Sequence, residues 1–160
     1  MFVVRPMLPA DAELVVAMHE APVRDGYVMS AVADRVVKRL AEPTNVDRVL
    51  EVDGRAVGML ALRFEADWLV EFQRIIVSEP GKGYGRAAVE WVKRFTFVES
   101  RAHRVYLDVV ARNARARRLY ESCGFVLEGT WRDGFRDPSG AYWDLCAYGM
   151  LERDYRDLSR

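Results

Sequence analysis

The sequence predicts a single α/β domain in which helices cover a mixed β-sheet, and three observations support this. The dipeptide Asp53-Gly54 separates two apolar segments and is a strong β-hairpin signal. Residues 105–110 are almost all apolar or β-branched, as in a strand covered on both faces. A helical pattern lies between this strand and the preceding one, which predicts a parallel pair with a right-handed crossover.

Length and composition favour one globular domain, residues 1–160, with 51% apolar residues and a formal net charge of zero. No bulk basic surface is available for nucleic acid. No apolar run approaches the roughly 20 residues that cross a bilayer, and the first residues lack the pattern of a signal peptide. Cys123 and Cys146 are too few for a disulfide framework or a metal knuckle. We therefore expect a cytoplasmic protein without a membrane, nucleic-acid or metal partner.

The first half of the chain predicts a strand, two helices and an antiparallel meander of three strands. Pro22 and Gly26 are expected to break the first helix. Ser30 is a favourable N-cap for the second, which Pro43 ends. The expected strands are 2–5, 46–52, 55–62 and 68–77, and the expected helices start at Pro9 and after Ser30.

The second half completes the order β-α-α-β-β-β-α-β-α-β-β. The helix after Gly85 has an apolar face that includes Ala88 and Val98, and it places Lys93 on the opposite face. Asn113 is suited to cap the next helix and Gly124 to end it. Further strands are expected over 105–110, 125–128 and 142–151, with a turn at 137–140.

A glycine-rich segment, residues 79–87, lies between the meander and the next helix. Glycines let a ligand approach the backbone, and the free N–H groups at a helix N-terminus favour anions. Lys82 and Arg86 add positive charge. The segment therefore predicts a pyrophosphate site, although a surface turn without a ligand would use similar residues.

Two other phosphate-binding motifs fit the segment less well. A P-loop is excluded because Gly83, rather than Ser or Thr, follows Lys82. A dinucleotide-binding fold is a closer rival, since Gly81-x-Gly83 is followed by Arg86 where a third glycine belongs, and Asp108 ends a later strand. Its position weakens this rival, because the turn lies mid-chain rather than after the first strand.

Two segments together resemble the GNAT superfamily of acetyl-CoA-dependent N-acetyltransferases, closest to the branch that holds ribosomal-protein alanine and spermidine/spermine N-acetyltransferases. The first runs from Glu71-Phe72-Gln73 to Gly81-Lys82-Gly83-Tyr84-Gly85, and the second joins Asn113, Ala116, Tyr120 and Gly124-Phe125. The resemblance covers residues 71–150, implies the GNAT-like acyl-CoA N-acyltransferase fold and excludes the dinucleotide rival. In one departure, Pro80 stands where the family usually has Gln or Arg, and proline offers no N–H.

The resemblance implies acetyl-CoA as co-substrate and no metal. The backbone of residues 81–86 would hold the pyrophosphate, and the strand edge at 75–77 would pair with pantetheine. Asn113 and Arg115 would lie along the path of coenzyme A, although a plain N-cap and a solvated arginine are the alternative interpretations. The predicted cofactor-binding residues are Ile75, Ile76, Val77, Gly81, Lys82, Gly83, Tyr84, Gly85, Arg86, Asn113 and Arg115.

Tyr120 and Glu71 are the predicted catalytic residues. A phenol with a pKa near 10 can hydrogen-bond a departing thiolate and give it a proton, although Tyr120 on a buried helix face is also typical of a core residue. Glu71 is expected to be the general base or a structural carboxylate, and Asp108 is a second candidate base. His19 is more typical of a packing residue. Trp68, Phe135, Tyr142 and Trp143 line an acceptor pocket or belong to the core.

These residues predict an N-acetyltransferase that transfers acetyl directly to a primary amine in a ternary complex. The acceptor is a small-molecule or peptide amine: a protein N-terminus, a polyamine, an aminoglycoside or an amino-acid-like amine. The alternative is a non-catalytic acyl-CoA sensor that binds the same ligand without turnover. The resemblance to this superfamily also implies a homodimer.

Overall fold

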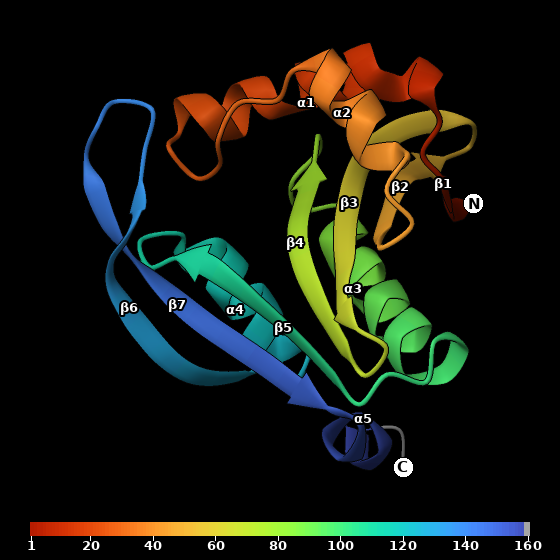
Figure 1. Ribbon diagram of the computed structural model, residues 1–160, viewed down its shortest axis with the longest axis vertical. Coiled ribbons are helices and arrows are strands. Elements are labelled where there is room, and N and C mark those ends of the chain that lie inside the picture. The colour runs from red at the N-terminus through yellow and green to blue at the C-terminus, as the bar shows by residue number, and fades with distance from the viewer. Residues whose placement is uncertain (159–160) are drawn as a thin grey trace.

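The computed structural model describes residues 1–158, which form one seven-stranded sheet with helices on both faces (Figure 1). The mixed α/β class is confirmed, and the predicted element order continues into one further helix. No helix in the described part of the chain is both long and apolar enough to span a membrane. The strands are β1 (Phe2–Pro6), β2 (Asn45–Val52), β3 (Arg55–Ala66), β4 (Leu69–Val77), β5 (Arg104–Val110), β6 (Val126–Arg136) and β7 (Tyr142–Leu151). The helices are η1 (Pro9–Asp11), α1 (Ala12–Arg24), α2 (Ala33–Leu40), α3 (Tyr84–Arg94), η2 (Phe95–Glu99), α4 (Ala114–Ser122) and α5 (Glu152–Leu158).

Strand order in the sheet is β1-β2-β3-β4-β5-β7-β6. The predicted hairpin turn joins β2 and β3, with φ of 49° at Asp53 and 78° at Gly54. Positive φ at both central residues is what the tight turn between twisted strands requires. The predicted turn between β6 and β7 is also present, at residues 137–140.

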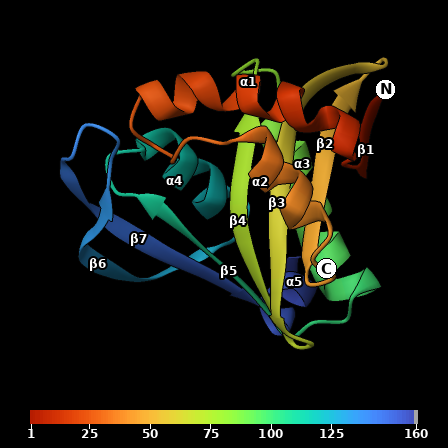
Figure 2. The same cartoon turned by 45° about the horizontal axis from the view of Figure 1, so that its top comes forward.

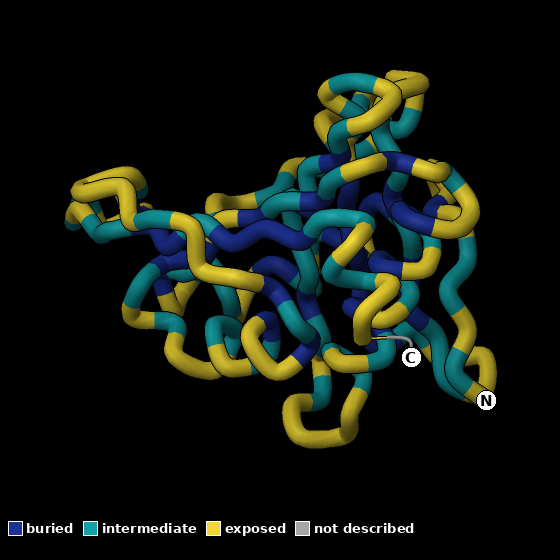
Figure 3. The backbone as a smooth tube through the Cα atoms, turned by 90° about the horizontal axis from the view of Figure 1, so that it is seen from below, coloured by how far each residue is buried: buried dark blue, intermediate teal, exposed yellow. Residues whose placement is uncertain are grey.

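Two apolar layers hold the helices against the sheet (Figure 2). On one face, α3 and α4 pack on a large cluster that includes Leu60, Val70 and Leu107. On the other face, α1 and α2 pack on a smaller cluster that includes Val15 and Ile76. The buried segments run through the centre of the molecule, and exposed segments surround them (Figure 3).

Strands β4 and β5 form a parallel pair, which is joined over a short length. The ladder pairs residues 69–71 with residues 104–106 and ends at Glu71 opposite Tyr106. Beyond this point the strands separate, and the gap widens toward α1 (Figure 1). Within residues 1–158, the β4 edge from Phe72 to Val77 therefore has no strand partner on the β5 side.

A register shift in the β3–β4 ladder leaves Gln73 without an opposite residue. Phe72 and Ile75 consequently both contact the large cluster, while Arg74 contacts α1 and Ile76 joins the small cluster. A bulge of this kind shifts the alternation of side chains between the two faces of a strand.

Two boundaries in the front helices differ from the prediction. Pro22 lies inside α1, whose last residue is Arg24, so it removes one backbone donor near the end of the helix without stopping it. α2 begins at Ala33 after Val32, and no side chain caps it, so the prediction that Ser30 is the N-cap was wrong. The residues before α2 line a cavity instead of starting a helix.

The second half also departs from the predicted pattern. Lys93 is buried because its Nζ donates to the Cys123 carbonyl over 3.0 Å, and Val98 is 54% exposed. α3 continues into the π-helical turn η2, which changes the phase of the apolar face. β6 extends to Arg136 because it follows β7 through two register shifts, and the predicted strand 125–128 was too short.

Gly58 in β3 permits the close approach of β4. A methyl group there would contact the Ile76 carbonyl oxygen, with Val77 Cα 3.2 Å away. We expect Gly58→Ala to lower the free energy of unfolding by about 1–3 kcal/mol, because backbone atoms yield less than side chains. Urea unfolding would measure this loss. Gly129→Ala is the matched control, since its methyl group would have no neighbour within 4 Å; equal losses in the two variants would contradict the packing argument.

Candidate functional site

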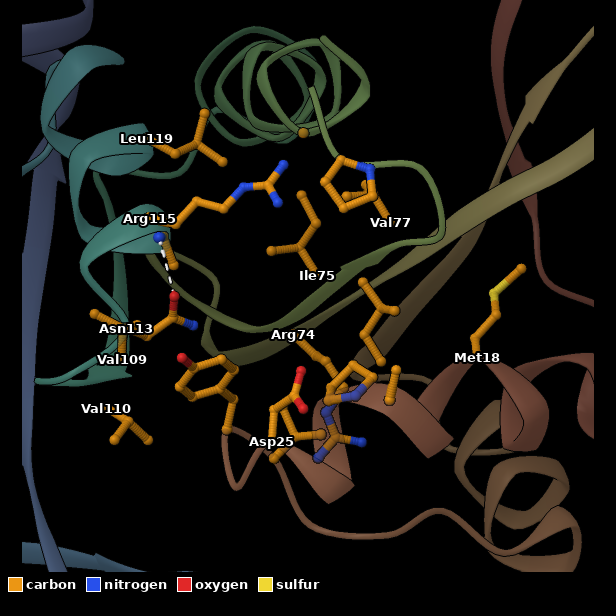
Figure 4. A pocket seen from close by; sticks show the side chains of 18 of the residues that line it. Met18, Asp25, Arg74, Ile75, Val77, Val109, Val110, Asn113, Arg115 and Leu119 are labelled. Carbon is orange, nitrogen blue, oxygen red and sulfur yellow. Dashed lines mark hydrogen bonds between the residues drawn. The ribbon is translucent and has the colours of Figure 1, made fainter. Parts of the chain in front are cut away.

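A cavity of about 810 Å³ lies where β4 and β5 separate. Its walls come from β4, β5, α1, the glycine-rich turn and α4 (Figure 4). The cavity thus brings together segments that are far apart in the sequence. Among its lining residues are Asp25, Arg74, Tyr84, Asp108, Arg115 and Tyr120.

The glycine-rich turn forms one end of this cavity. Gly81 and Gly83 have φ of 84° and 82°, which side-chain-bearing residues rarely adopt. Gly83 is the N-cap of α3, and no side chain caps the helix. The N–H groups of residues 84–86 have no acceptor among the described residues. Free N–H groups at a helix N-terminus are suited to an anion, which agrees with the prediction for this turn.

Asn113 and Arg115 lie at the N-terminus of α4, beside the same end of the cavity. Asn113 caps the helix through its Oδ1, which accepts a bond from Ala116 N over 3.2 Å. Arg115 is exposed and extends from α4 toward the side of the cavity that holds Val77 (Figure 4). Every predicted cofactor-binding residue lines the cavity except Lys82, which is exposed and lies outside the wall.

Tyr120 lies in the cavity wall with its ring fixed by aromatic packing. The ring centroid is 6.1 Å from Phe72 and 6.0 Å from Phe125. Its hydroxyl has no hydrogen-bond partner among the described residues. Burial raises the pKa of Tyr120, and the negative charge of Asp108 raises it further. The phenol therefore stays protonated at neutral pH and is free to donate to a ligand.

The structure places the two candidate bases differently. Asp108 lines the large cavity with Tyr120, and burial together with the charge of Glu71 raises the pKa of Asp108. Glu71 lines a smaller pocket of about 410 Å³, and Gln73 and Arg74 line both. The Glu71 carboxylate accepts a bond from Gln73 Nε2 at 2.8 Å and lies 3.3 Å from an Arg63 nitrogen.

The other predicted site residues are distributed around the cavity. His19 is buried beneath it and does not line it. Among the four aromatic residues, Phe135 lines the wall. Trp68 lies at the opposite end of β4, and Tyr142 is 61% exposed. Trp143 belongs to a cluster at the cavity rim.

This rim cluster centres on Arg112, which follows β5 and was not identified from the sequence. Its guanidinium carbon lies 4.3 Å from the Trp143 ring centre and 4.9 Å from that of Tyr27. The same group donates to the Asp25 carbonyl over 2.8 Å. Arg112 thereby joins the loop after α1 to the β6–β7 hairpin, and Tyr27, Asp25 and Phe135 are part of the cavity wall.

Asp137 supports the hairpin side of the rim cluster. It accepts a bond from Trp143 Nε1 over 2.8 Å and bonds from Ser139 and Ala141. Hydrogen bonds, the strongest from the Ser139 side chain, lower the pKa of Asp137 to about 2. The carboxylate therefore remains charged throughout the pH range in which the protein would be assayed.

A splayed parallel pair, a glycine-rich turn with free N–H groups and an available phenol in one cavity are the features of the acyl-CoA N-acyltransferase class of fold. The chain belongs to the Acetyltransferase (GNAT) family, whose model matches residues 17–125. The predicted resemblance is therefore confirmed.

Three comparisons describe the relationship more closely. An uncharacterized N-acetyltransferase of Mycobacterium tuberculosis (strain ATCC 25618 / H37Rv) is 33% identical over 113 residues, 70% of each chain. A spermidine N(1)-acetyltransferase of Vibrio cholerae is 37% identical over 90 residues, 56% of this chain and 51% of that protein. The matched region thus spans about half of that relative. A structure of spermidine N-acetyltransferase from Vibrio cholerae in complex with CoA and spermine has a TM-score of 0.86 at 23% identity, covering 97% of this chain and 98% of that one.

Proposed function

We propose that the protein transfers an acetyl group from acetyl-CoA to a primary amine, both held at once in the cavity between β4 and β5. Acetyl-CoA, when bound, supplies the acetyl group as a reactive thioester. The observation that supports this proposal most strongly is the position of Tyr120. Its unpaired hydroxyl and the free N–H groups of residues 84–86 belong to one cavity whose β4 side is an open strand edge.

The residues present fit this co-substrate. The N–H groups of residues 84–86 would donate to the diphosphate, and Arg115 would add a positive charge beside it. The unpaired backbone groups of residues 75–77 would bind the amide groups of pantetheine as a strand partner does. Asn113 orients the first turn of α4 by capping it, which holds Arg115 in place.

Three proton transfers accompany the proposed reaction. An acceptor ammonium first loses a proton to a carboxylate, for which Asp108 is placed in the cavity and Glu71 lies in the adjoining pocket. As the new N–C bond forms and the C–S bond breaks, Tyr120 gives its hydroxyl proton to the departing sulfur. The attacking nitrogen then loses its second proton to the Tyr120 phenolate, and the carboxylate releases the first proton to solvent.

The experiment is a thiol-release assay with acetyl-CoA and a panel of amines, in which mass spectrometry identifies the acetylated product. Turnover with at least one amine is expected. If acetyl-CoA binds but no amine causes thiol release, the result would contradict the proposed enzymatic function and favour the acyl-CoA sensor. The spermidine acetyltransferase among the relatives makes polyamines one class for the panel. Amino acids, aminoglycosides and peptides complete it.

Replacing Arg112 is expected to weaken binding of the acceptor more than binding of acetyl-CoA. The reason is that Arg112 joins the loop after α1 to the β6–β7 hairpin, and we expect the acceptor to bind beside these two segments. We expect Arg112→Ala to raise the acceptor KM about tenfold, which corresponds to the loss of about 1.4 kcal/mol of cation–π and hydrogen-bond energy. The Kd of acetyl-CoA, measured by calorimetry, should stay within about twofold. Arg118→Ala, an exposed change on α4, is the control. A rise in the acetyl-CoA Kd with an unchanged acceptor KM would contradict this role.

A further inference from the structure

Arg74 has no acidic partner among the described residues, although it lies inside the protein at the boundary of two cavities. No described carboxylate lies within 4.0 Å of its guanidinium group. Arg74 lines both the large cavity, with Tyr120, and the smaller pocket, with Glu71. Its side chain is among those that surround the large cavity in Figure 4. A partly buried cation of this kind is costly unless an anion compensates it.

Among the residues that the structure describes, the polar partner of Arg74 is the uncharged side chain of His19. His19 Nδ1 donates to the Val15 carbonyl over 2.7 Å, so Nε2 is the acceptor for Arg74 Nη1 at 2.8 Å. Burial lowers the pKa of His19, and the charge of Arg74 lowers it further. The histidine therefore orients the guanidinium group without neutralising it.

The nearby acids Asp47 and Glu71 already have other partners. Asp47 accepts two bonds from Arg39, at 2.8 and 3.0 Å. Glu71 is paired with Arg63 and Gln73. Burial lowers the pKa of Arg74 and the charge of Arg39 lowers it further, while Asp47 partly opposes them. One positive charge is thus left at the junction of the two cavities.

Negative charge is present elsewhere on the wall of the large cavity. Asp108 on β5 and Asp25 after α1 both line it, and neither carboxylate is paired at short range with a cation that lines the cavity. An acceptor bound there would meet carboxylates suited to an ammonium group and a guanidinium group suited to a carboxylate.

From this arrangement we propose that the acceptor is an amino-acid-like amine, whose carboxylate is bound by Arg74 while its ammonium group faces Asp108. The proposal rests on the acetyltransferase function and specifies its substrate class. Arg74 is then a specificity-determining residue. A polyamine would instead bring a further ammonium group toward Arg74, and the like charges would oppose its binding.

Pairs of substrates that differ only in the carboxylate test directly whether Arg74 binds that group. Lysine and cadaverine form one pair, and ornithine and putrescine form another. We expect the wild-type kcat/KM to be at least about tenfold higher for the amino acid of each pair, as for one charge-assisted hydrogen-bonded contact. In Arg74→Gln the two members of a pair should come within about twofold, mainly through KM. Arg115→Gln, a change of another cavity arginine, should reduce overall efficiency but preserve the preference.

Ligand binding gives a second measurement that does not depend on turnover. Nα-acetyllysine should raise the Tm of the wild-type protein more than N-acetylcadaverine does, and Arg74→Gln should abolish the difference. If the wild-type kcat/KM for cadaverine, putrescine or spermidine equals or exceeds that for the amino acids, the proposal is overturned. The proposed acetyltransferase function would still stand. Failure of every amine to release thiol would instead count against the proposed function. The Tm comparison would then still decide whether Arg74 binds a carboxylate.

Discussion

Tyr120→Phe is expected to lower kcat by about 10²- to 10⁴-fold, the usual contribution of a positioned general acid. The change removes one oxygen atom and leaves the ring in its contacts with Phe72 and Phe125. Because the hydroxyl has no hydrogen bond to a described residue, its loss should leave folding intact. The Kd of acetyl-CoA should also change little. Steady-state kinetics and calorimetry with the purified variant would measure both quantities.

Tyr148→Phe is the matched control for this variant. Tyr148 is fully buried in the same aromatic group, 6.3 Å from Tyr120 between ring centres. Its hydroxyl is satisfied, since it donates to Glu121 and accepts from Arg117. This control should lose about 1 kcal/mol of stability and keep its kcat. If Tyr120→Phe and wild type have equal kcat values, Tyr120 is not the proton donor.

The second large effect is expected at Asp108. We expect Asp108→Asn to lower kcat/KM by about 10²-fold or more, because an amide cannot take a proton from the acceptor ammonium. A base must be deprotonated to act, so wild-type kcat/KM should fall as pH drops through the pKa of Asp108. Burial and the charge of Glu71 raise that pKa, so the fall should begin above the range of an ordinary aspartate. Asp108→Asn should remove this acidic limb.

Glu71→Gln separates the two candidate bases. Removing the negative charge of Glu71 should lower the pKa of Asp108, since the carboxylate of Asp108 is then less destabilised. The acidic limb of the pH profile should move to lower pH, with most activity retained. An inactive Glu71→Gln together with an active Asp108→Asn would identify Glu71 as the base and contradict the role proposed for Asp108.

Local chemistry made several elements predictable. Asp53-Gly54 produced the expected hairpin because positive φ is intrinsic to that dipeptide turn. As expected, Asn113 caps the start of α4 and Gly124 follows its end. Asn113 does so through a side-chain hydrogen bond, and Gly124 has a φ of 92°. The prediction for Ser30 was wrong, because α2 begins after Val32 and no side chain caps it.

The candidate site was predictable where a motif lies on one continuous segment. The turn at 79–87 and the helix bearing Tyr120 were both identified from sequence, and both reach the cavity. Arg112 and Arg74 were missed because their partners are remote: Arg112 contacts Tyr27 and Trp143, and Arg74 contacts His19. A single sequence carries no signal for such pairs.

By itself the sequence determined the mixed sheet, the glycine-rich turn before α3 and the helix that bears Tyr120, because each depends on backbone conformations and periodicities that neighbouring residues set. Only the tertiary structure decided which carboxylate shares the cavity with Tyr120 and where the unpaired charge of Arg74 lies. The physical reason is the path of β4. Its ladder with β5 stops at Glu71, and the bulge at Gln73 changes which side chains face α1. Neither feature follows from the alternation of residues along the strand.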